Sequence, residues 1–146
     1  MPRVVRSADV VWEGTVARGS GTISAGTGAF SSLPYSLPAR VGAPEGKTSP
    51  EELLAAAHAG CFAMGLAGEL AARGTPGRVS VTAAVTLDEV EGKGHQIVRS
   101  EITGTAAADG LTAAALAEAA RAADEGCPFS ALIRAGAEVA VDVRLA

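Results

Sequence analysis

Alternation of apolar and polar residues predicts strands in the middle and at the end of the chain. Between residues 78 and 87, Val, Ala and Leu at odd positions alternate with mostly polar residues at even positions. This is the period of a strand with one buried face. Residues 138–145 alternate in the same way. A Gly-Lys-Gly turn at 92–94 connects the first of these strands to another around residues 96–103.

The N-terminal third also has the pattern of strands and turns. Residues 9–18 and 21–26 flank a Gly-Ser-Gly sequence, which favours a β-hairpin. Residues 34–40 contain Pro34 and Pro38, so we expect an extended segment at a sheet edge there.

A long apolar stretch predicts the main helix at residues 50–73. Thr48 or Ser49 can cap its N-terminus, Pro50 suits its first turn, and the two glutamates that follow complement the helix dipole. Gly74 ends the helix. Because the stretch is apolar on nearly every side, we expect it to be buried on most sides.

Two further helices are predicted before the last strand. The alanine-rich residues 111–126 form the first, and residues 127–136 form a short second one with Cys127 at its N-cap and Pro128 at its first position. The predicted fold class is therefore α+β, with largely antiparallel strands, one long central helix and a helical pair before the final strand. The length of 146 residues fits a single domain, residues 1–146.

Composition and charge narrow the class of function. The chain is 48% hydrophobic but only 3% aromatic, so its core must consist mainly of small aliphatic residues that allow close approach, including approach of a second subunit. Its formal charge of -4, without long basic runs, argues against a nucleic-acid surface. We find neither a signal peptide nor 18 uninterrupted apolar residues, so a cytoplasmic protein without a membrane span is expected.

The two cysteines are the main candidates for chemistry. In a reducing compartment they are either a transient catalytic pair or two inert buried thiols. Cys127, at a helix N-cap, would face unpaired N–H groups that favour the thiolate, although it could be only a small residue that suits a cap. Cys61 lies in the middle of the long helix, where burial raises a thiol pKa and where a cysteine is more often packing than catalysis.

Two residues could change that interpretation of Cys61. Arg40, between prolines and a glycine just before the helix, is the best candidate for a permanent cation beside a thiolate. His58 lies three residues before Cys61, which suggests a Cys-His nucleophile or a metal pair, but a buried helical His more often satisfies a core hydrogen bond. No pair of ligands has zinc-finger spacing, so no metal is expected.

Several motifs together resemble the OsmC/Ohr family of organic hydroperoxide reductases. TSPEELLAAAHAGCFAM is similar to the family's peroxidatic helix, and GCPFSALI to its second-cysteine motif. VVWEGTVARGSGTIS and LPARVGAPEGKTSPEE resemble the OsmC branch rather than the Ohr branch. The likeness spans nearly the whole chain, and the two cysteines are 127 − 61 = 66 positions apart.

The resemblance implies a thiol peroxidase that reduces organic hydroperoxides, and hydrogen peroxide less well, in defence against oxidative or osmotic stress and without a cofactor. It implies that Cys61 attacks the peroxide and becomes a sulfenic acid, and that Cys127 resolves this to a disulfide. Arg40 and Glu51 match the pair that polarises the attacking thiol and orients the peroxide. An external dithiol, for which a lipoylated protein is one candidate, would then reduce the disulfide.

Helix geometry bears on the assembly that the resemblance implies. Glu51 and Cys61 are ten residues apart on one helix, about 15 Å of rise, which is too far for one ion-pair network. The simplest arrangement lets Arg40 and Glu51 act on Cys61 of a second subunit, in agreement with the intertwined homodimers of the family.

Two other functions stay open at this stage. One is a non-catalytic module of the OsmC fold that binds an apolar ligand at the dimer interface, although it would need neither cysteine, Arg40 nor Glu51. The other is an acyl hydrolase using Cys61 and His58, for which no oxyanion hole can be located in the sequence.

Overall fold

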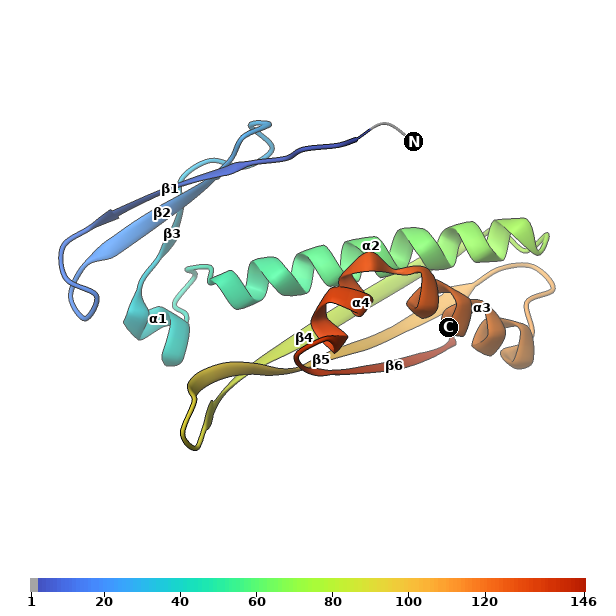
Figure 1. Cartoon of the computed structure of the whole chain (residues 1–146). Helices are drawn as coiled ribbons and strands as arrows, with labels where there is room; N and C mark the ends of the chain where they lie inside the picture. Colours follow the sequence, from blue (N-terminus) through green and yellow to red (C-terminus); the bar gives the residue numbers. More distant parts are fainter. Residues whose placement is uncertain (1–2) are drawn as a thin grey trace. The chain divides into compact units, whose positions relative to one another are not determined.

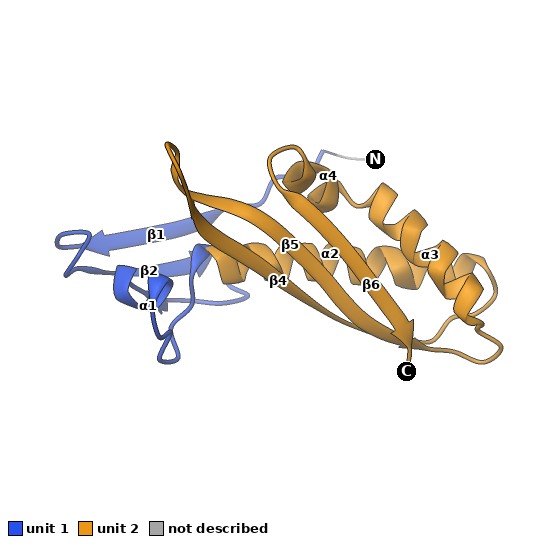
Figure 2. Cartoon of the chain, turned by 90° about the horizontal axis from the view of Figure 1, so that it is seen from below, with its two compact units in different colours: residues 1–50 blue, residues 51–146 orange. Residues whose placement is uncertain are grey.

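The structure of this protein is a computed structural model that describes residues 3–146. The chain forms two compact units, the first ending at Pro50 and the second running from Glu51 to Ala146 (Figure 2).

The first unit is built on a three-stranded antiparallel sheet. Its strands are β1 (Ala8–Glu13), β2 (Ser20–Ala25) and β3 (Leu33–Tyr35), in the order β1-β2-β3. The predicted hairpin is confirmed, but its first strand ends at Glu13 and residues 14–19 form the connection. On the sheet, the rings of Trp12 and Tyr35 meet edge to face with centroids 5.4 Å apart. Gly21 permits this contact, since a Cβ there would lie 2.5 Å from the Tyr35 ring and 2.7 Å from the Trp12 ring.

The prediction of an extended segment over residues 34–40 is partly wrong. Only Leu33–Tyr35 is a strand, and α1 (Leu37–Val41) follows it immediately. The Oγ of Ser36 accepts a hydrogen bond of 3.3 Å from the backbone N–H of Ala39, and Pro38 stands in the first turn. A serine at the N-cap followed by a proline in the first turn favours the start of a helix. Pro38 therefore belongs to the first turn of α1 and not to a sheet edge.

The second unit packs helices against one mixed sheet (Figure 1). Its elements are α2 (Pro50–Ala72), β4 (Arg78–Val90), β5 (Gly94–Ala107), α3 (Ala113–Gly126), α4 (Pro128–Arg134) and β6 (Glu138–Leu145). β4 and β5 form the predicted antiparallel hairpin. β6 pairs with β5 in parallel, because α3 and α4 carry the chain back along the sheet between them. The sheet order is β4-β5-β6.

The hydrophobic core of this unit lies between α2, α3 and one face of the sheet. α2 contributes Phe62, Leu66 and Leu70, at a spacing of four residues that places them on one stripe. β5 contributes Ile102 and Ala106, and the face of α3 is formed by Leu116, Ala119, Ala120 and Ala123. The small alanines of α3 let it approach α2 closely: a Cβ added at Gly65 would lie 3.7 Å from the Cβ of Ala123.

Within a single chain α2 is buried on one stripe only, so the expectation of burial on most sides is wrong for the chain alone. In its most apolar stretch of 18 residues, 22% of the residues are buried, and Met64 is 79% exposed. By length and composition α2 could cross a membrane. The core helix of a water-soluble protein meets the same criterion, which makes this weak evidence.

Candidate active site

The fold of the second unit brings the two cysteines together. Cys61 stands in the middle of α2 and is partly exposed, whereas Cys127 caps α4 and is only 3% exposed. Both are free thiols, and each affects the titration of the other: a hydrogen bond between them lowers the pKa of Cys127 and raises the pKa of Cys61. The fold therefore brings two thiols that are 66 positions apart in the sequence close to each other.

Local sequence explains how Cys127 is held. Its backbone is extended (φ -83°, ψ 114°), as expected of an N-cap between two helices, and Pro128 begins α4 without an N–H group. The Cys127 sulfur accepts a hydrogen bond of 3.4 Å from the backbone N–H of Ser130. The sulfur thus occupies the position that a serine or aspartate oxygen takes in other helix caps.

These contacts make Cys127 the more acidic thiol. Burial by itself raises the pKa of Cys127, but hydrogen bonds from the backbone and the hydroxyl of Ser130, from Cys61 and from the backbone of Phe129 outweigh it. The net pKa of Cys127 is lowered, as the N-cap position predicted.

Cys61 is shifted in the opposite direction. Burial raises the pKa of its thiol, and the hydrogen bond that it donates to Cys127 raises it further. The backbone of Phe129 lowers it by a smaller amount. Within the chain that the structure describes, the contacts on Cys61 therefore favour the protonated thiol.

His58 is fully buried between two serines. Its Nδ1 lies 2.7 Å from the Ser100 Oγ and its Nε2 lies 2.8 Å from the Ser130 Oγ. Both ring nitrogens are therefore occupied, and neither serves Cys61 or a metal in this structure. The Cys-His nucleophile and metal-pair hypotheses are not supported, and the core hydrogen bond that a buried helical histidine usually makes is what the structure contains. Among residues 3–146 no three His, Cys, Asp or Glu side chains lie close enough to hold a metal ion.

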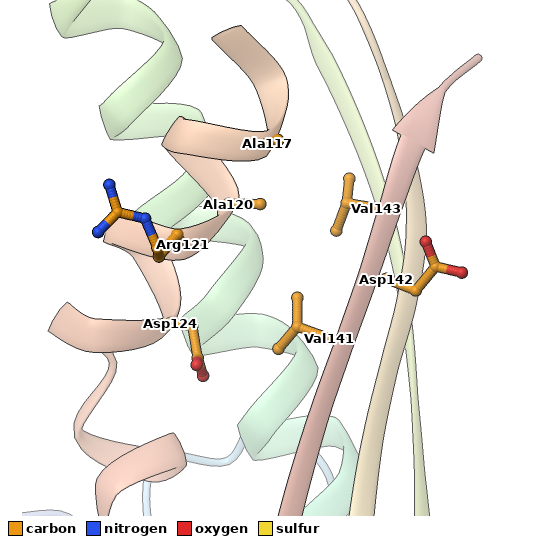
Figure 3. A pocket seen from close by; sticks show the side chains of 7 residues that line it. All are labelled: Ala117, Ala120, Arg121, Asp124, Val141, Asp142 and Val143. Carbon is orange, nitrogen blue, oxygen red and sulfur yellow. The ribbon is translucent and has the colours of Figure 1, made fainter. Parts of the chain in front are cut away.

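Charged groups near His58 come from α3 and α4. Burial lowers the pKa of His58, while the charge of Asp124 raises it and that of Arg134 lowers it. Asp124 and Arg134 are themselves paired, with Oδ2 and Nη2 2.8 Å apart. Asp124 also lines a pocket of about 450 Å³ between α3 and β6 (Figure 3), so water reaches the outer side of this pair. The pocket is lined by Ala117, Ala120, Arg121, Asp124, Val141, Asp142 and Val143.

The other two predicted site residues have different surroundings. Glu51 is a buried residue in the first turn of α2, ten positions before Cys61 and so about 15 Å from it along the helix. Arg40 belongs to the first unit, in the last turn of α1. There it lines a small, mainly apolar pocket of about 210 Å³ with Trp12, Val16, Tyr35, Ser36 and Leu37. Of the four predicted residues, the second unit brings only the two cysteines into contact.

Two residues of the site, Ser100 and Ser130, were missed from the sequence. Ser100 has a detectable signal, because it shares the face of β5 that carries the buried Ile102 and Ala106. A polar residue on an otherwise apolar face needs a buried partner. Ser130 stands three residues after a capping cysteine, where its N–H is expected to reach the cap, but nothing in the sequence indicates that its hydroxyl contacts His58.

Comparison with known proteins places this arrangement in a family. A family model described as OsmC-like protein matches residues 42–142. The chain is 37% identical over 135 residues to Peroxiredoxin OsmC of Escherichia coli (strain K12), covering 92% of each sequence. The structure of the organic hydroperoxide resistance protein OhrB of Bacillus subtilis superposes with a TM-score of 0.73 at 25% identity, over 94% of this chain and 97% of that one. An organic hydroperoxide resistance protein OsmC of Legionella pneumophila has the same TM-score at 24% identity, over 98% and 100%. The extent of the family match and the identity to the Escherichia coli protein show that this chain belongs to the OsmC family.

Proposed function

We propose that this protein is a thiol peroxidase that reduces organic hydroperoxides through Cys61 and Cys127. The Cys61 thiolate attacks the O–O bond of the peroxide, an alcohol leaves, and Cys61 becomes a sulfenic acid. The Cys127 thiolate then attacks the Cys61 sulfur, forming a disulfide and releasing the hydroxyl group as water. An external dithiol, for which a lipoylated protein is one candidate, returns both residues to thiols.

The observation that carries this proposal is the contact between an accessible and a buried thiol. Cys61 is partly exposed, whereas Cys127 is 3% exposed and contacts Cys61. A peroxide can reach the first sulfur but not the second, and only the second can reach a sulfenic acid on the first. This favours an enzyme over the alternative of a non-catalytic module, which needs no pair of thiols in contact.

The lowered pKa of Cys127 fits the second role rather than the first. A thiol of low pKa is the better leaving group when a disulfide is reduced. When the external dithiol attacks the Cys61 sulfur, Cys127 leaves as a stabilised thiolate. The same hydrogen bonds therefore assist both the formation of the disulfide and its later opening.

Activation of Cys61 must come from groups that its own surroundings in α2 do not supply. We assign it to Arg40 and Glu51 of a second subunit in a homodimer. Arg cannot lose its proton and would favour the Cys61 thiolate, while Glu51 would orient Arg40. The apolar face of α2 that a single chain leaves exposed, with Met64 at its surface, is the surface that a second copy would cover.

The proposal extends to the organisation of the chain and its environment. The OsmC match crosses the boundary between the two compact units, which supports one OsmC-like domain over residues 1–146. A cysteine pair that cycles between dithiol and disulfide fits a reducing compartment, and we place the protein in the cytoplasm. Defence against oxidative or osmotic stress is the corresponding cellular role.

Single-turnover oxidation with cumene hydroperoxide tests the roles of the two thiols. Wild type, Cys61→Ser and Cys127→Ser are reduced, freed of reductant, and mixed with one equivalent of peroxide, and the loss of thiols is followed with time. We expect wild type to form a disulfide, Cys127→Ser to stop at a sulfenic acid that a dione probe traps, and Cys61→Ser to be inert.

Parallel reactions with hydrogen peroxide measure the preference for organic substrates. We expect thiols to be lost more slowly with hydrogen peroxide than with cumene hydroperoxide. If Cys127→Ser were inert while Cys61→Ser reacted, the two roles would be reversed. If neither thiol of the wild type reacted faster than free cysteine, the peroxidase function itself would be rejected.

A further inference from the structure

Three polar side chains in the interior of the second unit neither attack the peroxide nor form the disulfide in the proposed reaction. Ser100 from β5, His58 from α2 and Ser130 from α4 are each 0% exposed. The serine hydroxyls lie 2.7 Å and 2.8 Å from the two nitrogens of the His58 ring. Replacing all the partners of a buried hydrogen bond by apolar side chains of the same shape can leave stability nearly unchanged, so stability alone does not require these three polar residues. Their presence therefore calls for an explanation beyond packing.

The chain of hydrogen bonds ends on the Cys127 sulfur. The Ser130 backbone N–H donates to that sulfur at 3.4 Å, and a hydrogen bond from the neighbouring Ser130 hydroxyl further lowers the pKa of Cys127. A hydroxyl has one proton to donate, so if that proton points to Cys127, the Ser130 oxygen accepts the proton of His58 Nε2. His58 Nδ1 is then the acceptor of the Ser100 hydroxyl proton. The neutral tautomer of His58 with its proton on Nε2 thus gives every donor in the chain an acceptor. In this tautomer each proton is donated to the next group along the chain toward Cys127.

We propose that Ser100 and His58 are positioning residues that hold the Ser130 hydroxyl proton on the Cys127 sulfur, so that Cys127 is a thiolate when Cys61 has become a sulfenic acid. The inference rests on the proposed function for the identity of that sulfenic acid. It assigns a role to a histidine that neither attacks substrate nor contacts the peroxidatic thiol.

The reaction balances without any further group. The Cys127 proton leaves to solvent, and the resulting thiolate uses one electron pair to form the S–S bond. The S–O bond of Cys61 breaks, and its hydroxide leaves as water after taking up a proton. The Ser130 hydroxyl stabilises the Cys127 anion before the attack and again when reduction of the disulfide releases it, and hydrogen bonds in such a chain strengthen one another.

The charges around the chain keep His58 in the required neutral form. Burial lowers the pKa of His58, and the opposing effects of Asp124 on α3 and Arg134 on α4 partly offset each other because these residues are paired. Cys61 on α2 is the other titratable group beside Cys127, and β5 contributes Ser100, which does not titrate. His58 can therefore donate through Nε2 over the whole neutral range.

Titration of Cys127 in a Cys61→Ser background tests the inference without any peroxide. The chain has two cysteines, so this background contains a single thiol, whose thiolate is followed by ultraviolet absorbance against pH. Added to it are Ser130→Ala, Ser100→Ala, His58→Gln and His58→Asn. The Gln amide nitrogen can replace Nε2 and donate to Ser130, whereas the shorter Asn reaches only the position of Nδ1.

We expect the pKa of Cys127 to rise in Ser130→Ala and His58→Asn, to rise less in Ser100→Ala, and to return toward its original value in His58→Gln. In the same substitutions made with Cys61 present, conversion of the sulfenic acid to the disulfide should slow about tenfold at neutral pH, since a hydrogen bond to a charged sulfur is lost. The pH profile of that step should move upward. The preceding peroxide step should keep its rate.

A purely structural role predicts another result. Folded variants with a lower melting temperature but an unchanged Cys127 titration would overturn the inference, as would equal titrations for His58→Gln and His58→Asn. If the His58 variants fail to fold, Ser130→Ala, which keeps the backbone N–H, and Ser100→Ala decide together, and an unchanged Cys127 titration in either variant overturns the inference. Because the titration uses no peroxide, a shifted titration in a protein inert to peroxides would reject the proposed function and leave this inference standing.

Discussion

The surroundings of the two sulfurs differ in how much of each a single chain supplies. Cys127 has a helix cap, a serine hydroxyl and a buried histidine behind that serine, all from the second unit. Cys61 is only partly exposed on α2, and its pKa is raised by burial and by Cys127. The second unit thus supplies the contacts of the proposed resolving cysteine, but its contacts on the proposed peroxidatic cysteine include no cation.

This difference suggests that the reaction of Cys61 with peroxide depends on dimerisation, whereas the attack of Cys127 on the sulfenic acid does not. A monomer would contain a Cys127 ready to form a disulfide but a Cys61 that reacts slowly with peroxide. Supplying the cation from a second chain would confine fast peroxide chemistry to the assembled protein.

Replacing the proposed cation should have the largest effect. We expect Arg40→Met to slow the reaction of Cys61 with cumene hydroperoxide roughly a hundredfold, because it removes a charge aligned with the developing thiolate and peroxide oxygens. The later disulfide step should be unchanged. Stopped-flow measurement of the peroxide reaction and of disulfide formation checks this. The matched control is Arg18→Met, which replaces an exposed arginine of the same unit. Equal rates for the two variants would remove Arg40 from the site.

Breaking the proposed interface should have the next largest effect. Met64, on the exposed face of α2, is replaced by Glu, which places a charge on a surface that a second copy would bury. We expect a monomer by light scattering and a peroxide step slowed about tenfold or more, by the loss of the partner's arginine. Leu145→Glu, at an exposed apolar position on β6, serves as the control. A monomeric Met64→Glu protein with full peroxidase activity would contradict the dimer model.

Titration of single-cysteine proteins should give a lower pKa for Cys127 than for Cys61. In the Met64→Glu monomer, Cys61→Ser should form the Cys127 thiolate at a pH below that of an ordinary cysteine, because the pKa of Cys127 is lowered. Cys127→Ser should form the Cys61 thiolate at a pH above it, because burial raises that pKa. Without Met64→Glu, the Cys61 pKa should fall as the partner supplies Arg40. A Cys61 titration that does not depend on assembly would show that its activation is local.

The sequence predicts most of this fold because its signals are local. The helix at residues 50–73, the hairpin around Gly92 and Gly94, and the capped helix after Cys127 all depend on residues close together in the chain, and all are confirmed. The prediction fails over residues 34–40, where a proline compatible with both a sheet edge and a first helical turn was assigned to the edge. The parallel pairing of β6 is a tertiary feature that alternation alone cannot indicate.

The site was less predictable because its contacts are distant in the sequence. The acidity of Cys127 follows from its cap position and could be derived locally. The contact with Cys61 and the pairing of His58 with Ser100 and Ser130 span 42 to 72 residues, so they depend on how α2, β5 and α4 pack. Only the family resemblance predicts that Cys61 is the thiol that attacks the peroxide, since the local arguments from the sequence favour Cys127 as the more reactive thiol.

The smallest effect is expected from the charged pair beside His58. Asp124→Asn removes the ion pair with Arg134. Because the Asp124 side chain is 19% exposed and that of Arg134 is 46% exposed, we expect the free energy of unfolding to fall by less than about 1 kcal/mol. Among the described residues the other Asp124 oxygen, Oδ1, is buried without a hydrogen-bond partner, so a neutral amide also relieves a desolvated charge.

Since the Asp124 charge raises the pKa of His58, its removal lowers that pKa and keeps the ring neutral to lower pH. The Cys127 titration should therefore stay unchanged, measured in the Cys61→Ser background. A shift as large as that of Ser130→Ala would mean that Asp124, rather than the hydroxyl chain, controls the acidity of Cys127.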